Sequence, residues 1–324
     1  MTTPAAHNQA ALSEQLDPYR RELHVHCYRM LGSFHEAEDL VQETFLRAWR
    51  ARDSFEGRSS LRSWLYRIAT NACLDALQRR SRKIGAEGEV LWLEPYPDEL
   101  LDEPAAAADD PESAVVDKET IELAFLVAIQ HVPPRPRAVL ILRDVLGWSA
   151  KETAALLGTS VATVTSALQR ARATMRRRLP ERRLEWAPGG DPGERERLLL
   201  DRYVEATGRG DASALVEMLT EDARFSMPPE PGVWVGRDAV VGSWVEGGFG
   251  SPEFGQIVCS LTRANRQPAV ANYVVKPGER VACGLALDVL RIERGAIAEV
   301  VTFPEDVFPA FGLPLRRRGP ARAR

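Results

Sequence analysis

The feature that most constrains this chain is residues 148–179, which read as two helices joined by a tight turn. Ser149 can cap the first helix, and Glu152 follows three residues later, as a capping box requires. Gly158 supplies the backbone freedom for the turn, and Ser160 can cap a second helix that ends in a run of arginines. A helix-turn-helix inserts such a second helix into the DNA major groove. The pattern therefore indicates nucleic-acid binding.

The second helix of this pair has an apolar stripe and a polar face. Val161, Val164 and Leu168 recur at helical spacing and are expected to face the core. The residues off this stripe form the candidate DNA-contact surface: Thr163, Ser166, Gln169 and Arg170.

Charge is distributed unevenly along the 324 residues. The net charge is −4, but residues 86–117 carry 11 acidic and no basic groups. Residues 12–85 carry 13 basic and 10 acidic groups, and residues 118–186 carry 12 and 6. Two basic modules therefore flank an acidic connector, and the segment charges are more informative than the overall isoelectric point.

Composition argues against several classes of site. The four cysteines are widely spaced and form no CxxC motif, which gives no support for a zinc site or a disulfide framework. His24, His26 and Cys27 lie close together on an amphipathic helical pattern, where such residues are more often structural than metal ligands. The N-terminus lacks the pattern of a signal peptide, and no apolar run reaches the roughly eighteen residues of a membrane helix. We expect a cytoplasmic protein with no metal and no cofactor.

Residues 12–84 show three helical patterns. The first ends at Gly32 and Ser33, the second covers residues 35–52, and the third covers residues 61–82 after a polar loop at 53–60. The second helix is expected to bury an apolar stripe at spacings of three and four. That stripe comprises Ala37, Leu40, Val41, Phe45, Leu46 and Trp49, while Asp39, Gln42 and Glu43 lie on the outer side.

The acidic connector contains an apolar island. Prolines and a four-alanine run at 105–108 favour a linker over a core segment. The island comprises Leu91, Trp92, Leu93, Tyr96 and Leu100. A purely solvated linker has no need of such residues, so we expect the island to dock on a partner or on another part of this chain.

The second half of the chain changes from helices to strands. Residues 118–180 are helical with a break at Pro133 and Pro134, and residues 187–193 form a Gly/Pro-rich hinge. Two short helices, at 195–208 and 211–219, precede alternating apolar runs. These runs are residues 223–227, 256–263, 269–275, 281–292 and 296–303. Helices followed by an antiparallel sheet predict an α+β domain.

Three segments together resemble the sigma-70 family of RNA polymerase specificity subunits, in its extracytoplasmic-function group. They read EAEDLVQETFLRAWR at 36–50, FEGRSSLRSWLYRIATNACLDALQRRSR at 55–82 and LRDVLGWSAKETAALLGTSVATVTSALQRARATMRRRL at 142–179. The resemblance implies a multidomain protein with two all-α sigma domains, a region 2 helical bundle at 12–85 and a region 4 helix-turn-helix at 118–186. The acidic linker at 86–117 joins them. The implied function is binding to core polymerase, recognition of the −35 and −10 promoter elements and initiation of transcription.

The resemblance also assigns roles to residues of region 2. The face formed by Asp39, Gln42 and Glu43 is expected to bind the clamp helices of the polymerase β′ subunit, and an acidic face suits a basic partner. The loop at 53–60 and the next helix resemble the part that opens the −10 element, where a base is unstacked and phosphates are held. The expected contacts there are Arg62, Trp64, Arg67 and Asn71. Trp64 fits core packing as well as base stacking.

In region 4 the expected −35 contacts are Ser160, Thr163, Ser166 and Arg170, half or more of them to phosphate. Thr165 stands where the family commonly has a basic residue, which predicts weak DNA binding by this domain alone. The arginines at 172 and 176–178 could bind phosphate, bind the polymerase β flap, or remain solvated at a helix end where the dipole favours cations.

The acidic linker occupies the position in the sequence where sigma factors of this family thread a chain toward the active cleft of polymerase. The negative charge of this linker could mimic the phosphate chain of a nucleic acid in that cleft, and it is equally consistent with a plain spacer.

Residues 195–315 resemble the SnoaL-like, nuclear-transport-factor-2-like fold, an α+β cone in which helices close a curved sheet around a pocket. The resemblance rests on LLDRYVEATGRGDASALVEMLTEDARFSMPP at 199–229, WVGRDAVVGSW at 234–244 and VVTFPEDVFPAFGLP at 300–314. This fold hosts enzymes and ligand sensors alike. Candidate pocket residues are Met227, Trp234, Trp244 and Asp288. No histidine follows His131, so the acid–base groups that catalytic members need are scarce, and we expect no enzymatic activity.

The leading hypothesis is a sigma factor modulated in cis by its C-terminal domain, which takes the place of a dedicated anti-sigma factor. One alternative makes that domain a small-ligand sensor or residual enzyme fused to the sigma factor. Two others are a regulator that binds DNA without polymerase and an enzyme with a helical targeting module. The basic tail at 316–324 is expected to be solvated and disordered.

Overall fold

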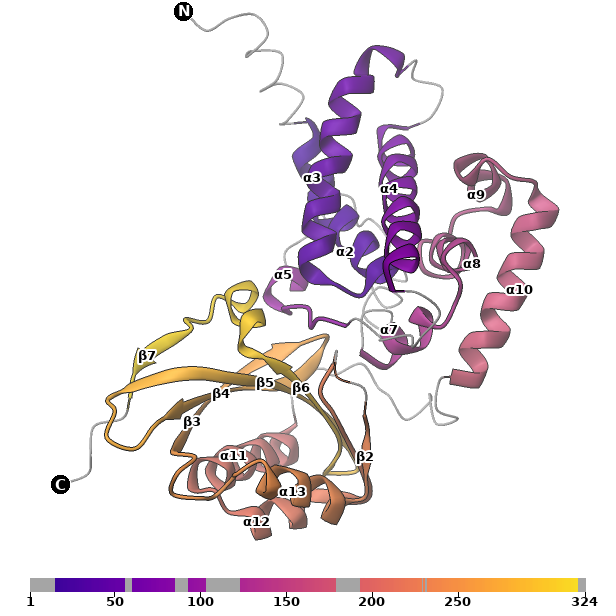
Figure 1. Cartoon of the computed structure of the whole chain (residues 1–324). Helices are drawn as coiled ribbons and strands as arrows, with labels where there is room; N and C mark the ends of the chain where they lie inside the picture. Colours follow the sequence, from indigo (N-terminus) through magenta and orange to yellow (C-terminus); the bar gives the residue numbers. More distant parts are fainter. Residues whose placement is uncertain are drawn as a thin grey trace, which may run out of the picture. The chain divides into compact units, whose positions relative to one another are not determined.

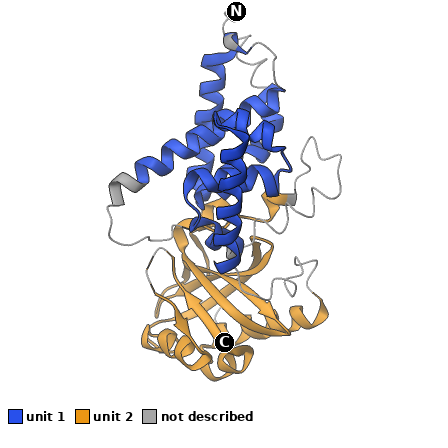
Figure 2. Ribbon diagram, turned by 90° about the vertical axis from the view of Figure 1, so that its right-hand side faces the viewer, with its two compact units in different colours: residues 1–93, 102–185 blue, residues 94–101, 186–324 orange. Residues whose placement is uncertain are grey.

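The computed structural model describes residues 15–55, 60–84, 93–102, 123–178, 193–228, 230 and 232–319. They fall into two compact units, which Figure 2 colours separately. The first unit comprises residues 1–93 and 102–185, and the second comprises residues 94–101 and 186–324. Within these ranges, no helix is long and apolar enough to cross a membrane.

The first helical group corresponds to the three patterns predicted for residues 12–84. It consists of α2 (Arg20–Leu31), α3 (Phe34–Ala51) and α4 (Leu61–Ile84), with 3-10 turns η1 (Asp17–Tyr19) and η2 (Arg52–Ser54) (Figure 1). Gly32 ends α2 in the left-handed conformation with φ of 76°, which glycine adopts without steric cost. Ser33 then begins α3, because its hydroxyl accepts a hydrogen bond from the Glu36 backbone N–H at 3.1 Å. The predicted break between these helices is confirmed.

The second helical group contains the predicted helix-turn-helix. Its elements are α7 (Leu123–Gln130), α8 (Pro134–Leu140), the π turn η3 (Ile141–Val145), α9 (Ala150–Leu157) and α10 (Val161–Arg178). The capping box at α9 is complete: Glu152 N–H donates to Ser149 Oγ at 3.2 Å, and Ser149 N–H donates to the Glu152 carboxylate at 2.8 Å. Gly158 makes the turn with φ of 61°. The helix-turn-helix prediction is confirmed.

Two residues assigned to apolar stripes lie on the surface instead. Leu46 of α3 is 50% exposed, and Val161 of α10 is 47% exposed. Both predictions of burial were wrong. Spacings of three and four define a stripe wider than the part of the helix that its neighbours cover, so residues at the edge of the stripe remain in solvent.

The C-terminal unit is an α+β domain built on a seven-stranded sheet. Its helices are α11 (Glu194–Arg209), α12 (Ala212–Met218), α13 (Arg237–Glu246) and the 3-10 helix η5 (Glu305–Phe311). Its strands are β1 (Leu219–Ser226), β2 (Trp234–Val235), β3 (Gln256–Ala264), β4 (Gln267–Val275), β5 (Val281–Glu293), β6 (Ala296–Pro304) and β7 (Arg316–Arg318). Figure 1 shows α11, α12 and α13 on one side of the curved sheet.

The strand order is β2-β1-β6-β5-β4-β3, with β7 paired to β5. The sheet was predicted to be antiparallel, and this is wrong for one pair: β1 runs parallel to β6. An alternating pattern shows which face of a strand is buried but carries no information on the direction of its partner. The basic tail was predicted to be disordered, but its first three residues form β7.

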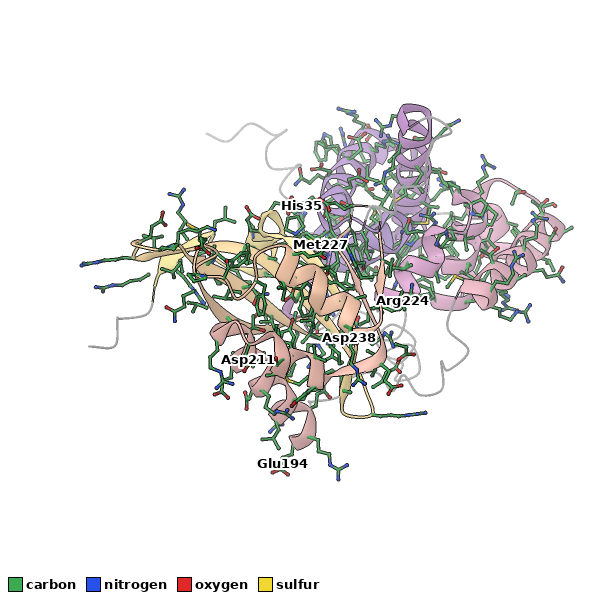
Figure 3. All side chains as sticks on the ribbon, turned by 60° about the horizontal axis from the view of Figure 1, so that its bottom comes forward. His35, Glu194, Asp211, Arg224, Met227 and Asp238 are labelled. Atoms are coloured by element: carbon green, nitrogen blue, oxygen red, sulfur yellow. The ribbon has the colours of Figure 1, made fainter. Side chains whose placement is uncertain are left out.

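A core fills the space between the sheet and the three helices. It includes Tyr203 of α11, Met218 of α12, Val241 of α13, Phe225 of β1 and Leu290 of β5, all less than 6% exposed. Each of these three helices has an acidic residue at its N-cap or in its first turn, as the helix dipole favours. Figure 3 labels Asp211 and Asp238 at the starts of α12 and α13, and Asp211 caps α12 by accepting from the Ala214 N–H at 3.0 Å.

Part of the predicted linker belongs to this C-terminal unit. Residues Glu94–Leu101, here called the docked segment, include the short helix α5 (Glu99–Asp102) except for its last residue. The segment lies against the turn between β3 and β4, where Pro97 forms an antiparallel bridge with Ala264. Tyr96 is buried and Leu100 is partly buried. Two island residues, Leu91 and Trp92, lie outside the described residues. For Tyr96, the prediction that the island docks on another part of this chain is confirmed.

Candidate nucleic-acid and polymerase interfaces

One outer face of α3 combines acidic residues with an exposed leucine. Asp39 and Gln42 are exposed and Glu43 is half-buried, one helical turn apart. Arg47 donates to Glu43 at 2.8 Å, and this hydrogen bond lowers the pKa of the carboxyl, which therefore stays charged. Leu46 stands seven residues after Asp39 and so completes the same face. Leu46 was not predicted to belong to this face, although its spacing of seven residues from Asp39 could have revealed it.

The residues predicted to act at the −10 element occupy different environments. Arg62 forms an ion pair with Glu22 at 2.7 Å and lies over the Tyr66 ring. Arg67 and Asn71 are exposed, four residues apart on one face of α4. Residues 56–59 of the preceding loop lie outside the described residues.

Trp64 is a packing residue beneath this face. Its side chain is 6% exposed, and its ring centroid lies 4.9 Å from that of Phe55. The structure therefore does not bring this ring to the surface beside Arg67 and Asn71.

The residues predicted to act at the −35 element lie along the exposed face of α10. Ser160, Thr163, Ser166 and Arg170 are all exposed. Ser160 caps the helix by accepting from the Thr163 N–H at 3.1 Å, and Arg170 donates to Ser166 Oγ at 2.7 Å. These contacts hold a hydroxyl at the helix N-terminus and a guanidinium nearly three turns further along the helix, both of which suit phosphate.

The arginines at the end of α10 differ from one another. Arg172 makes two hydrogen bonds to the Asp144 carboxylate, at 2.8 and 2.7 Å, which raise its pKa. Arg176 and Arg177 are exposed. A bidentate pair restrains its guanidinium, so the two later arginines are better placed to contact an external anion.

Helices of the two groups pack against each other within the first unit. The buried Arg137 of α8 donates to the Met30 carbonyl at the end of α2 at 2.5 Å, and to the Val132 carbonyl at 3.1 Å. The rings of Tyr66 in α4 and Trp148 before α9 lie 5.4 Å apart. The buried guanidinium thus ties the C-terminal end of α2 to the second group.

Three family models match the chain. Sigma-70 region 2 matches residues 16–83, Sigma-70 region 4 matches residues 122–175, and the SnoaL-like domain matches residues 200–300. The ECF RNA polymerase sigma factor SigG of Mycobacterium tuberculosis is 42% identical over 328 residues, covering 96% of this chain and 86% of SigG. The chain belongs to the extracytoplasmic-function (ECF) sigma factors. Such proteins work with core RNA polymerase and promoter DNA.

Two further relatives agree with this assignment. SigW of Bacillus subtilis is 33% identical over 181 residues, which cover 53% of this chain and 90% of SigW. The crystal structure of the Mycobacterium tuberculosis ECF sigma factor SigJ matches with a TM-score of 0.60 at 23% identity, over 94% of this chain and 99% of that one. That likeness shows a shared fold. The predicted family and the predicted fold class of this sigma factor are confirmed.

The candidate pocket residues of the SnoaL-like domain divide into two clusters. The rings of Trp234 and Trp244 lie 5.2 and 5.4 Å from that of Phe225, and Met227, labelled in Figure 3, packs on the same apolar core. Asp288 belongs to a separate buried polar cluster.

Both carboxylate oxygens of Asp288 accept hydrogen bonds. The Tyr203 hydroxyl at 3.2 Å and the Asn272 amide at 2.7 Å donate to one oxygen, and the Thr302 hydroxyl donates to the other at 2.5 Å. Burial raises the pKa of Asp288, against the opposing effect of these bonds. These three partners of Asp288 were not predicted from the sequence. The polar positions in the apolar runs ANYVV and VVTFP could have pointed to Asn272 and Thr302.

No group of three or more His, Cys, Asp or Glu side chains within the described ranges is arranged to hold a metal ion. His24, His26 and Cys27 are all buried in the first helical group. His26 shares a hydrogen bond with the Thr70 hydroxyl at 2.9 Å. These contacts are those of packed core residues.

Proposed function

We propose that the SnoaL-like domain modulates this sigma factor in cis by holding the docked segment. The single observation that carries the proposal is that Glu94–Leu101, which lies between regions 2 and 4 in the sequence, belongs to the C-terminal unit. A domain that holds this segment restrains the connection between the two promoter-reading regions.

The attachment is made by specific polar contacts as well as by burial. Tyr96 N–H donates to Asn265 Oδ1 at 2.8 Å, and Asn265 N–H donates to the Tyr96 carbonyl at 2.9 Å. Asp98 accepts from the Arg266 N–H at 2.7 Å and from the Arg263 guanidinium at 3.2 Å. Such reciprocal bonds between buried groups specify one register of the segment.

The segment also lies in the stretch that sigma factors of this family thread toward the active cleft of polymerase. A linker held on the SnoaL-like domain is not free to enter that cleft. Docking therefore restrains initiation in this proposal, and release of the segment permits it. The C-terminal domain would in this way replace a dedicated anti-sigma factor, and the protein would act in the cytoplasm, beside its polymerase.

The proposed contacts with polymerase and promoter follow from the exposed faces. Asp39, Gln42 and Glu43, with Leu46 among them, bind the β′ clamp helices. Interface centres are apolar and their rims are polar, so Leu46 suits the centre of such a contact and the acidic residues suit its rim. The proposed −10 contacts are Arg62, Arg67 and Asn71, with Trp64 supporting them from below. The proposed −35 contacts are Ser160, Thr163, Ser166 and Arg170, and the end of α10 faces the β flap.

The test is run-off transcription by holoenzyme reconstituted with purified core polymerase. Asp98→Ala removes the acceptor of both arginine contacts, whereas Glu99→Ala changes an exposed carboxylate on the next residue. We expect Asp98→Ala, and a chain ending at residue 188, to change promoter-specific transcription about fivefold or more, the size of a modest coupling free energy. Glu99→Ala should leave it unchanged. If Asp98→Ala and the chain ending at residue 188 both leave transcription and the affinity for core polymerase unaltered, cis modulation is rejected.

A second candidate function for the SnoaL-like domain is that of a small-ligand sensor or residual enzyme. A buried carboxyl group with a raised pKa, such as Asp288, is the observation that favours it. Because protein donors already occupy both oxygens, we assign Asp288 a structural role. Asp288→Asn should then leave transcription unchanged at equal folded protein, and a selective loss of response to a ligand would favour the sensor.

A further inference from the structure

A cleft of about 970 Å³ opens on the C-terminal unit, and none of the residues that line it is a site residue named above. Four segments line it: the turn from α11 to α12 (207–210), the approach to β3 (250–257), the β4–β5 hairpin (275–280) and the end of β7 (318–319). All four belong to the SnoaL-like domain, so the cleft does not depend on the first unit.

Glycines define the walls of this cleft. Gly210 and Gly250 approach so closely that a Cβ on Gly250 would lie 2.7 Å from the Gly210 carbonyl oxygen. A Cβ on Gly255 would lie 2.4 Å from the Val275 carbonyl oxygen. Side chains at these positions would push the walls apart. The close approach of the wall segments, and with it the shape of the cleft, therefore depends on glycine at these positions.

The charged groups at the cleft are mostly cationic. Lys276, Arg280 and Arg318 are exposed there, and Glu279 is the acidic residue in the lining. A fourth cation, Arg209, is already paired with Glu205 at 2.7 Å. The ammonium of Lys276 donates to the Phe254 carbonyl at 3.1 Å, which holds it at the rim.

Strand β7 extends this cationic surface beyond the cleft. Arg318 pairs with Val281, directly after Arg280, and Gly319 N–H donates to the Arg280 carbonyl at 2.9 Å, so the two arginines come from adjacent strands. Arg316 is exposed two residues earlier on the same strand. Side chains at i and i+2 share one face about 6.6 Å apart, close to the rise of two nucleotides along a DNA strand.

Arg317, between them, has a different role. It donates to Ser260 Oγ at 2.5 Å and to the Val258 carbonyl at 3.1 Å, and it lies 3.8 Å over the Tyr273 ring. This anchor holds β7 to the body of the domain and leaves Arg316 and Arg318 to face outward. Charged edge strands also prevent aggregation, but that role does not require an anchored strand beside a glycine-walled cleft.

We propose that the cleft and β7 bind the phosphodiester backbone of duplex DNA through Lys276, Arg280, Arg316 and Arg318. Phosphate is the ligand that matches neighbouring arginine side chains. A row of cations along an edge strand matches a polymer of phosphates better than a single small anion. The chain already works on promoter DNA, so the surface would add contacts independent of base sequence, whether or not the domain also acts through the docked segment.

The test measures binding of the full chain to a labelled duplex of arbitrary sequence by fluorescence anisotropy over a range of salt concentrations. The cleft variant is Arg280→Gln with Arg318→Gln, and its matched control is Arg195→Gln with Arg197→Gln, two exposed arginines at the start of α11. All four side chains are exposed, and melting temperatures confirm equal folding. Loss of two phosphate contacts should reduce the slope of log K against log salt by about 1.8.

A smaller slope in the cleft variant alone supports the proposal. An unchanged slope, or an equal reduction in the control, overturns it. A third arm adds inorganic phosphate or ATP. If either raises the melting temperature of the wild type but not of the cleft variant, and the DNA slope is unchanged, the cleft is a small-anion site and the DNA proposal fails. Regions 2 and 4 are intact in every variant, so failure here leaves the proposed cis modulation standing.

Discussion

Asn265 is the residue whose replacement should most directly loosen the docked segment. It is fully buried, occupies the left-handed region with φ of 54°, and accepts the hydrogen bond from the Tyr96 N–H. In Asn265→Gly the turn keeps its conformation, but the buried Tyr96 N–H loses its acceptor. This loss should reduce the free energy that holds the docked segment in place by about 1–3 kcal/mol. Asn265→Ala loses the same bond and adds about 1 kcal/mol of strain, because alanine disfavours positive φ.

The assay is amide hydrogen exchange at Tyr96. A loss of about 2 kcal/mol corresponds to an increase in exchange rate of roughly thirtyfold in Asn265→Gly, with a larger increase in Asn265→Ala. Arg294→Gly is the matched control, since Arg294 also has positive φ, at 53°, in the turn between β5 and β6. In Arg294→Gly the exchange rate of the Tyr96 amide should equal that of the wild type. A rate in Asn265→Gly equal to that of the wild type, or an alanine variant that exchanges more slowly than the glycine variant, would refute the reasoning.

Three further predictions concern stability. Burial lowers the pKa of His24 to about 4 and of His26 to about 3, so below pH 6.5 only the unfolded chain takes up these protons. Urea titrations should show the free energy of unfolding of the first unit falling by about 1.6 kcal/mol per histidine between pH 6.5 and 5, and a flat profile would contradict the assignment. Asp288→Leu leaves three buried donors without an acceptor, so urea titrations should show the free energy of unfolding reduced by about 3 kcal/mol or more. Asp288→Asn should reduce it less, and equal reductions in the two variants would argue against the hydrogen-bond network. Gly255→Ala should lower the melting temperature far more than Gly278→Ala, because both have positive φ but only the first places a Cβ against backbone.

Local features of this chain were predictable from the sequence because their causes are local. Ser149 and Glu152 satisfy each other's backbone within four residues, and Gly32 and Ser33 end one helix and begin the next through their own conformations. Periodicity alone did not reveal which residues on an apolar stripe are covered by a neighbour. Leu46 was therefore predicted to be buried, although the neighbouring helices leave its side chain in solvent.

Features that depend on distant partners were not predictable in the same way. Asn265 and Tyr96 stand 169 residues apart, and the acidic connector gave a reason to expect docking but not its location. Arg316 and its two neighbours read as a solvated tail, since only the free edge of β5 makes them a strand. Asp288 stood out as an acid in a strand, but its role depends on donors from α11, β4 and β6.

The packing of the two helical groups adds a constraint on how this sigma factor reaches a promoter. The −35 and −10 elements lie about 25 base pairs apart, or roughly 85 Å along the duplex. In the first unit, Arg137 of α8 is bonded to the end of α2, and Trp148 lies against Tyr66 of α4. Helices in direct contact could not reach both elements of the proposed promoter site at once, so we expect binding to polymerase to separate them. That separation breaks the hydrogen bond between Arg137 and the Met30 carbonyl, and the loss of this charge-assisted bond opposes opening by about 1.5–3 kcal/mol. If Asp39, Gln42 and Leu46 form the proposed interface, their contacts with polymerase have to supply at least this much free energy.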